Sequence, residues 1–218
     1  MNRWITFDVG ETIFDERGLW ARWADWLGVD RQCFILELQA TIRAGRHHRE
    51  VFQMFRPGFD IEQAEAERRA EGDPPGFVEA DLFPDVRGAF AKLRAEGYKI
   101  AIAGNTSLAT EQVLARAGLG ADLIASAARW QVEKPNPAFF QCLSRACGAE
   151  FRDMVYVGDR IDNDVLPALG VGMAAVWLRR GMWAQAHADW YGAHRASVII
   201  DHLDALPNAI AAQAWRSA

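Results

Sequence analysis

Two short apolar segments that each run into acidic residues constrain the fold of this chain more than any other feature. Residues 4–7 lead directly into Asp8, and residues 154–157 lead into Gly158-Asp159 and then Asp164. Carboxylates crowded at strand ends repel one another and lose solvation, so packing does not explain them. Hard Mg²⁺, in contrast, takes carboxylate oxygens as ligands. Since ligands of parallel sheets bind beyond the carboxyl ends of the strands, we predict that both segments belong to one parallel sheet and share a metal site.

Strand and helix patterns alternate along the chain from residue 83 onward. The predicted strands lie at 99–103, 123–126, 154–157, 174–178 and 198–200, and helical patterns occur between them, among others at 108–117 and 136–147. Such alternation is typical of βαβ units, with helices on both faces of a parallel sheet. The predicted fold class is therefore α/β, with a Rossmann-like doubly wound parallel sheet as its core.

The segment after the first strand has a different character. Apolar residues between 20 and 42 recur at helical spacing, residues 63–71 are charged and rich in alanine, and no strand pattern interrupts the region. We predict an all-helical domain at residues 15–80, inserted into an α/β core formed by residues 1–14 and 81–218.

Composition narrows the class of protein. The chain has 218 residues, half of them apolar, which is enough for a core domain and a smaller insert. A net charge of −5 argues against a nucleic-acid partner. Three cysteines without a Cys-x-x-Cys pair, no signal-like segment and no long apolar run indicate a cytoplasmic protein with no membrane partner. Monomer and homodimer both remain open.

A lysine completes the set of residues at the predicted site. Lys92, Lys99 and Lys134 are the three lysines of a chain that otherwise uses arginine, and Lys134 directly precedes a proline. This position indicates a need for a compact point charge. The alternative is an ordinary surface lysine at the start of a helix.

In order, spacing and strand context, these residues resemble the motifs of the haloacid dehalogenase (HAD) superfamily, most of whose members are phosphatases. The resemblance covers nearly the whole chain, since the helical insert lies where the family has its cap domain. It implies that Asp8 is the nucleophile and forms an aspartyl-phosphate. It also implies that Mg²⁺ is held by Asp8, Asp159 and the backbone carbonyl of Gly10, with Asp164 behind them or reaching the metal through water. Lys134 would neutralise the charges of phosphate and nucleophile.

The chain departs from the family's first motif at Gly10. The family has there a second aspartate, which protonates the leaving oxygen and then activates water, and loss of a general acid/base typically costs about 10²–10⁴-fold in rate. Glu11 is a possible replacement, although as the neighbour of Gly10 we expect it to point elsewhere. His47 and His48 in the insert are further candidates if a cap closes over the site, but a charged run of this kind is usually a solvated surface.

A second departure concerns the phosphate. The family's serine or threonine at the end of strand 99–103 corresponds to Gly104 here. Backbone N–H groups of Gly104 and Asn105 remain able to bind phosphate, and Thr106 or Ser107 is a possible substitute. Lys134 is the charged member of this predicted phosphate site.

Three functions are compatible with these residues. The leading prediction is a Mg²⁺-dependent hydrolase of a small phosphorylated metabolite, weakened by Gly10. The second is a lapsed member that binds metal or phosphate without turnover. The third is a 2-haloacid dehalogenase, although those relatives lack the Gly-Asp metal arm kept at Gly158-Asp159. Relatives that cleave phosphonates use a cap lysine, and the insert contains none.

Overall fold

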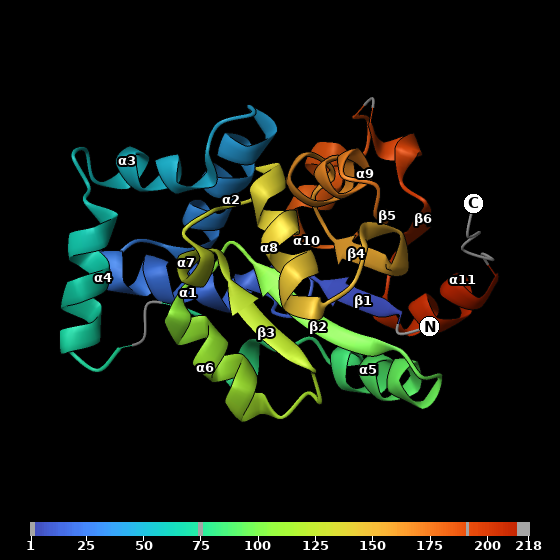
Figure 1. Cartoon of the computed structure of the whole chain (residues 1–218). Coiled ribbons are helices and arrows are strands. Elements are labelled where there is room, and N and C mark those ends of the chain that lie inside the picture. The colour runs from blue at the N-terminus through green and yellow to red at the C-terminus, as the bar shows by residue number, and fades with distance from the viewer. Residues whose placement is uncertain (1–2, 74–75, 191, 213–218) are drawn as a thin grey trace. The chain divides into compact units, whose positions relative to one another are not determined.

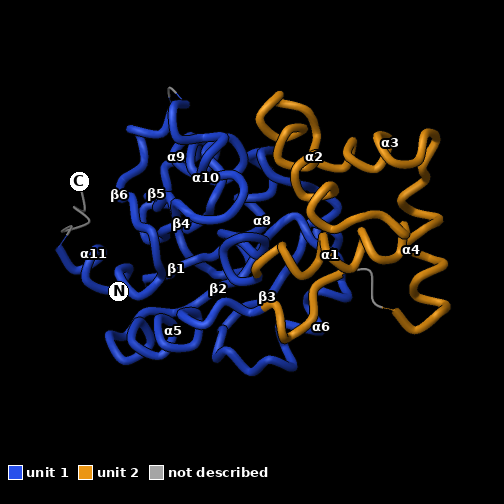
Figure 2. The backbone as a smooth tube through the Cα atoms, turned by 180° about the vertical axis from the view of Figure 1, so that it is seen from behind, with its two compact units in different colours: residues 1–14, 82–218 blue, residues 15–81 orange. Residues whose placement is uncertain are grey.

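The computed structural model describes residues 3–73, 76–190 and 192–212. The chain divides into two compact units, one made of residues 1–14 and 82–218 and the other of residues 15–81 (Figure 2). We call them the core unit and the insert unit. That the insert acts as a cap stays a prediction. No helix in the described ranges is long and apolar enough to cross a membrane.

The core unit is built on a six-stranded sheet in which every neighbouring pair of strands is parallel. The strands are β1 (Trp4–Phe7), β2 (Lys99–Gly104), β3 (Leu123–Ser126), β4 (Met154–Gly158), β5 (Ala174–Leu178) and β6 (Val198–Ile200). Their order, β3-β2-β1-β4-β5-β6, reverses direction between β1 and β4. The predicted doubly wound α/β fold is confirmed, and ligands of such sheets bind where the order reverses.

Helices cover both faces of this sheet. They are α5 (Asp85–Ala95), α6 (Leu108–Ala117), α7 (Ala127–Trp130), α8 (Pro137–Cys147), α9 (Leu166–Gly170), α10 (Gly181–His187) and α11 (Leu206–Ala212). α5 contacts α11, whereas α8 contacts α9 across the sheet from them (Figure 1). Every residue of β1 and β4 is buried, as expected for strands covered on both faces.

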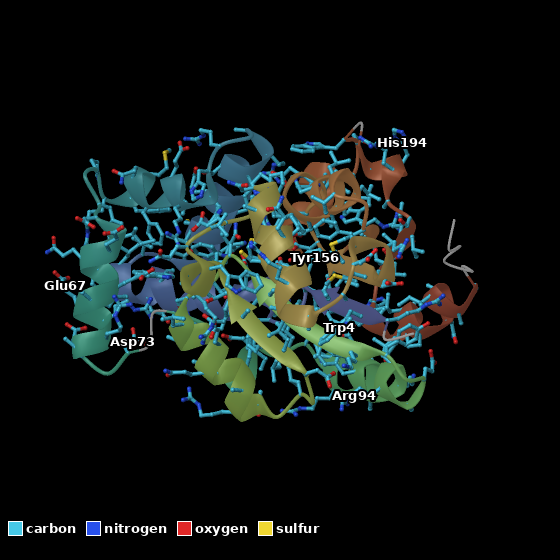
Figure 3. All side chains as sticks on the ribbon, in the orientation of Figure 1. Trp4, Glu67, Asp73, Arg94, Tyr156 and His194 are labelled. Atoms are coloured by element: carbon cyan, nitrogen blue, oxygen red, sulfur yellow. The ribbon has the colours of Figure 1, made fainter. Side chains whose placement is uncertain are left out.

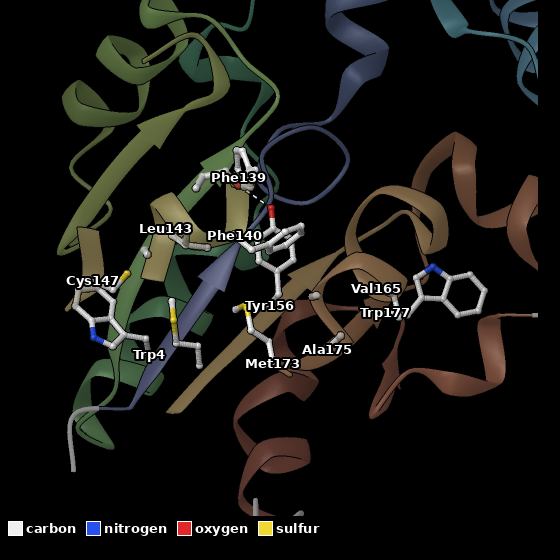
Figure 4. Packing of buried hydrophobic residues seen from close by; sticks show 14 of the residues in the cluster. Trp4, Phe139, Phe140, Leu143, Cys147, Tyr156, Val165, Met173, Ala175 and Trp177 are labelled. Carbon is white, nitrogen blue, oxygen red and sulfur yellow. Dashed lines mark hydrogen bonds between the residues drawn. The ribbon is translucent and has the colours of Figure 1, made fainter. Parts of the chain in front are cut away.

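One layer of the core lies between the sheet and α8. Phe140 packs edge-on against Tyr156 of β4, with ring centroids 5.3 Å apart, and Phe139 packs against Phe140 (Figure 4). Tyr156 lies among buried side chains, whereas the exposed Arg94 lies at the periphery of this unit (Figure 3).

The insert unit has its own aromatic core. Its helices are α1 (Glu16–Leu27), α2 (Arg31–Arg43), α3 (Val51–Phe55) and α4 (Ile61–Ala70). Phe52 contacts Trp23 at 5.0 Å, Phe59 at 4.7 Å and Phe34 at 5.7 Å between ring centroids. Aspartates cap the N-termini of α1, α2 and α4. A unit with its own core and capped helices is organised as a separate domain.

Strand register decides which residues meet at the edge of the sheet. Phe7 of β1 pairs with Ile102 of β2 and with Val157 of β4. Asp8, the next residue, therefore emerges between the ends of these two strands, and its N–H donates to the Val157 carbonyl at 2.9 Å.

Candidate active site

Three buried carboxylates converge at the carboxyl end of β1 and β4. Asp8, Asp159 and Asp164 each place an oxygen within 4.8 Å of an oxygen of the other two. Asp8 and Asp159 follow neighbouring strands, and Asp164 follows the turn after β4. The structure thus brings together the three acids that the sequence placed at one site.

Lys134 lies among these acids. Its Nζ is 2.6 Å from Asp8 Oδ1 and 2.5 Å from Asp164 Oδ1, and its side chain is fully buried. Burial alone would lower the pKa of Lys134, but the charges of Asp164 and Asp8 outweigh it and hold this pKa well above its usual value. The Lys134 ammonium thus pairs with two of the three carboxylates.

Asn105 fixes the backbone of Lys134. The Asn105 amide donates to the Lys134 carbonyl at 2.9 Å and accepts from the Lys134 N–H at 2.8 Å. This side chain therefore positions the lysine, a role that sequence reasoning missed because the two residues lie far apart in the chain. Phosphate binding by the Asn105 N–H stays a prediction.

Gly104 makes room for the predicted nucleophile. A Cβ at this position would lie 2.5 Å from Asp8 Oδ1 and 3.1 Å from Val9 Cγ2. Contacts this short are repulsive, so no other residue fits without displacing Asp8.

Two hydroxyl residues follow Gly104. Ser107 caps α6 by accepting from the Thr110 N–H at 3.3 Å. The Thr106 hydroxyl oxygen is buried and has no hydrogen-bond partner in the described part of the chain. Of these two hydroxyls, that of Thr106 is the one left available to a ligand.

Asp164 belongs to a π-helix, Ile161–Val165. This rare element is frequent at functional sites. Asp164 Oδ2 accepts from the Arg160 N–H at 3.0 Å, and a Cβ on Gly158 would come within 2.4 Å of the Asp164 carboxyl carbon. Burial, reinforced by the negative charge of Asp8, raises the pKa of Asp164 to about 6 although Lys134 opposes the shift.

The backbone next to Asp159 is held from β5 and α10. Trp177 Nε1 donates to the Asp159 carbonyl at 2.8 Å. The Ile161 N–H donates to His187 Nδ1 at 3.1 Å. Neither partner could be recognised from the sequence, since Trp177 lies in an apolar strand and His187 lies in a segment where no element is predicted.

Tyr156 lies beneath the lysine. Its hydroxyl donates to the Ala103 carbonyl at 2.7 Å, and Lys134 Nζ is 5.2 Å from its ring centroid. Burial raises the pKa of Tyr156 well above its usual value, although Lys134 opposes the shift. The phenol is thus uncharged and packs beside the Lys134 ammonium.

The candidate replacement acids occupy other places. Glu11 has a φ of 49°, and its carboxyl lies against Gly181, where a Cβ would come within 2.4 Å of Glu11 Cδ. His47 belongs to the insert unit and accepts from the Arg49 N–H through Nδ1. His48, in the same unit, packs edge-on against Trp20. A catalytic role for either histidine stays the less favoured of the two interpretations of this segment.

Fold and site together define a class: proteins with a doubly wound parallel sheet that carries a strand-end aspartate, a buried lysine and an acidic pair. A sequence profile described as haloacid dehalogenase-like hydrolase matches residues 3–172. The chain belongs to this family.

Some relatives are named as phosphatases and others as dehalogenases. The chain is 34% identical over 110 residues to a glyceraldehyde 3-phosphate phosphatase of Methanopyrus kandleri, covering 49% of this chain and 47% of that protein. Its fold is similar to a HAD phosphatase from Thermococcus onnurineus, with 23% identity, a TM-score of 0.61 and coverage of 96% and 98%. A 2-haloacid dehalogenase from Pseudomonas syringae is similar too, with 21% identity, a TM-score of 0.58 and coverage of 97% and 99%.

These matches limit what can be transferred. The chain spans about half the length of the curated relatives it matches. The two solved structures share its fold and carry different activities in their names, so the fold alone does not choose between them.

Proposed function

We propose that this chain hydrolyses phosphate monoesters of small metabolites with the help of Mg²⁺, through an aspartyl-phosphate on Asp8. The observation that carries the proposal is the joint placement of Asp8 against Lys134, at 2.6 Å, and within a cluster of three buried carboxylates. A dehalogenase attacks carbon and needs no metal, so it would not need a third carboxylate, that of Asp159, beside Asp8 and Asp164.

The donor set fits Mg²⁺. Three carboxylates whose oxygens lie within 4.8 Å of one another offer hard oxygen ligands, and Lys134 pairs with two of them. Asp8, Asp159 and the Gly10 carbonyl would hold the ion, with Asp164 behind them or linked through water. When bound, Mg²⁺ would offset charge on the phosphoryl oxygens and orient the group toward Asp8.

The residues of the chain supply the remaining steps. An Asp8 oxygen attacks phosphorus, the bond to the ester oxygen breaks, and that oxygen takes a proton from solvent water as the alcohol leaves. Water then hydrolyses the acyl phosphate, releasing inorganic phosphate and restoring Asp8. Lys134 offsets the negative charges of the phosphoryl group and of the Asp8 carboxylate. The Thr106 hydroxyl and the N–H groups of Gly104 and Asn105 would bind the phosphoryl oxygens.

Proton transfer is the weak step of this scheme. Gly10 has no side chain to protonate the leaving oxygen, and the Glu11 carboxyl lies against Gly181. We expect turnover about 10²–10⁴-fold below that of relatives with an aspartate at this position.

A binding-only protein is the second candidate. The observation that favours it is the pair of glycines, Gly10 and Gly104, that flank the nucleophile where the family has an acid and a hydroxyl. Such a protein would bind Mg²⁺ and phosphate without releasing product.

The test is phosphate release from a panel of phosphomonoesters, with glyceraldehyde 3-phosphate first because relatives carry that name. Wild type is compared with Asp8→Asn and with the control Asp201→Asn, whose carboxylate is an exposed partner of Arg179. We expect turnover that requires Mg²⁺ and Asp8 and that survives in the control. Mg²⁺ and phosphate binding without turnover would select the binding-only protein, and halide release from 2-chloropropionate without metal would select the dehalogenase.

A further inference from the structure

We propose that Arg180 is a positioning residue that holds the loop after β1 in the conformation seen in the structure before any ligand binds. The loop comprises residues 8–14, and its importance rests on the proposed function, in which Asp8 and Gly10 act. The hold itself is a property of the folded chain and can be tested apart from that function.

Arg180 follows β5 and uses all of its guanidinium nitrogens. Nε donates to the Glu11 carbonyl at 3.1 Å, Nη2 donates to the Thr12 carbonyl, and Nη1 lies 3.0 and 2.8 Å from the two carboxylate oxygens of Asp85. The side chain is only 11% exposed. One guanidinium therefore joins two successive carbonyls of the loop to an acid at the start of α5.

The groups that Arg180 contacts outside the loop are themselves held in place. Asp85 Oδ2 also accepts from the Leu203 N–H at 2.8 Å, which ties the carboxylate to the segment after β6. The guanidinium carbon lies 3.8 Å from the centroid of the Phe83 ring. A planar fork that bonds at three corners and stacks on a ring is specific to arginine, and a lysine ammonium cannot reproduce it.

The loop needs such a hold because of its backbone. Glu11 has a φ of 49°, in the left-handed region that is unfavourable for a residue with a side chain and persists only where surrounding structure imposes it. The carbonyls that Arg180 binds are those of Glu11 itself and of the next residue. Gly181 leaves room for the same loop, since a Cβ there would lie 2.4 Å from Glu11 Cδ. Two adjacent residues after β5 are thus adapted to one turn after β1.

The consequence for the site follows from connectivity. Gly10 lies between Asp8 and Glu11, so release of Glu11 from its strained conformation would change the backbone that carries the nucleophile and the Gly10 carbonyl. Preorganisation of this kind is what a metal and phosphoryl site requires.

Arg179 offers a matched control. It is the neighbouring residue and pairs with Asp201 through two bonds of 2.8 and 3.0 Å, but its side chain is 49% exposed and these bonds do not involve the loop. Arg180→Met, Arg180→Lys and Arg179→Met are compared by hydrogen exchange in the presence of a chelator. The probes are the amides of Ile13 and Phe14, which donate to the Val9 carbonyl at 2.8 and 3.0 Å.

We expect Arg180→Met to speed exchange at these two amides at least tenfold while amides of β2 keep their rates. In Arg180→Lys, the exchange rates of these two amides should lie between those of wild type and of Arg180→Met. In Arg179→Met, they should stay within twofold of the wild-type rates. Mg²⁺ affinity, measured calorimetrically, should fall at least tenfold in Arg180→Met and stay within twofold in the control.

Unchanged exchange at Ile13 and Phe14 would overturn the proposal, and so would acceleration spread evenly over the sheet, which indicates a general stabilising role. If Arg180→Met does not fold, Arg180→Lys is judged by the same comparison: its Ile13 and Phe14 amides should exchange faster than in wild type while the amides of β2 keep their rates. Because exchange is measured without metal or substrate, absence of phosphate release by wild type would refute the proposed function and leave this result standing.

Discussion

At the residue scale, the site depends on a lysine that separates two buried acids. Replacing Lys134 with methionine would leave Asp8 and Asp164 facing each other without an ammonium. Removing one partner of a buried ion pair typically costs about 3–5 kcal/mol. We expect Lys134→Met to lower the free energy of unfolding by that order in a chelator, and by less with Mg²⁺ present, since the metal would offset the same charge.

Urea unfolding with and without Mg²⁺ checks this prediction. Lys92→Met serves as the control, because Lys92 is exposed on α5 and far from these acids in the sequence. A loss that Mg²⁺ does not reduce would mean that the metal does not bind beside Lys134.

Gly104 is the second residue whose identity matters. Because a Cβ there would lie 2.5 Å from Asp8 Oδ1, restoring the family's serine should displace the nucleophile and not repair the site. We expect Gly104→Ser to lower kcat at least tenfold and stability by about 1–3 kcal/mol.

The control for that change is Gly88→Ser on α5, where the nearest atom to an added Cβ is 3.8 Å away. Phosphate release and thermal unfolding are measured for both variants. Higher activity in Gly104→Ser would show that Asp8 can move and that the missing hydroxyl limits turnover.

At the scale of elements, His187 of α10 anchors the π-helix that carries Asp164. Its Nδ1 accepts from the Ile161 N–H, which requires the neutral ring. Burial, reinforced by Arg160, lowers the pKa of His187 from 6.5 to about 4 and outweighs Asp162. Between these values the unfolded chain binds the proton and the folded chain does not, so stability falls as pH drops from 6.5 to 4, by no more than about 3.5 kcal/mol.

His187→Asn should keep an acceptor for Ile161 and remove this titration. Urea unfolding of metal-free protein between pH 4 and 7 should then show a shallower pH dependence than wild type, while His202→Asn, at an exposed histidine, should not differ from it. Equal slopes in all three proteins would mean that His187 titrates alike in folded and unfolded chains.

Strands of the core were predictable because each is a short, largely apolar run with polar or glycine residues close to both ends. The ranges 123–126 and 174–178 were predicted as they occur. α10 and the π-helix were missed, because Gly181–His187 is short and Ile161–Val165 reads as a loop rich in acids. Their conformations depend on contacts such as that of Ile161 with His187, which local sequence does not record.

At the scale of the whole molecule, the site could be located from sequence because parallel strands end at a common edge. Asp8 and Asp159 directly follow strands that pair with each other, so topology brings them together, and the π-helix after β4 adds Asp164. The supports of the site come from other parts of the chain: Asn105 beneath Lys134, Tyr156 beneath the ammonium and Arg180 behind Glu11. Each is a contact between residues far apart in the sequence, and no local pattern distinguishes such a residue from its neighbours.

The separate cores of the two units lead to a last prediction. The chain leaves and re-enters the core unit side by side: the Phe83 N–H donates to the Ile13 carbonyl at 3.0 Å, and the Asp15 N–H donates to the Asp81 carbonyl at 2.8 Å. An antiparallel pair of this kind can be closed by a two-residue Asn-Gly turn. We expect a chain in which Asn-Gly replaces residues 16–80 to fold, because all six strands lie outside that segment.

Circular dichroism and calorimetry test this shortened chain against wild type. Mg²⁺ affinity should stay within about threefold, since Asp8, Asp159 and Asp164 all belong to the core unit. If the insert is the predicted cap, turnover should fall at least tenfold and the preference among phosphomonoesters should flatten, because a lid excludes water and contacts the substrate. Asp8→Asn in the shortened chain controls for background hydrolysis. Full activity with unchanged preference would refute the cap role, and a chain that binds no Mg²⁺ although folded would place part of the metal site in the insert.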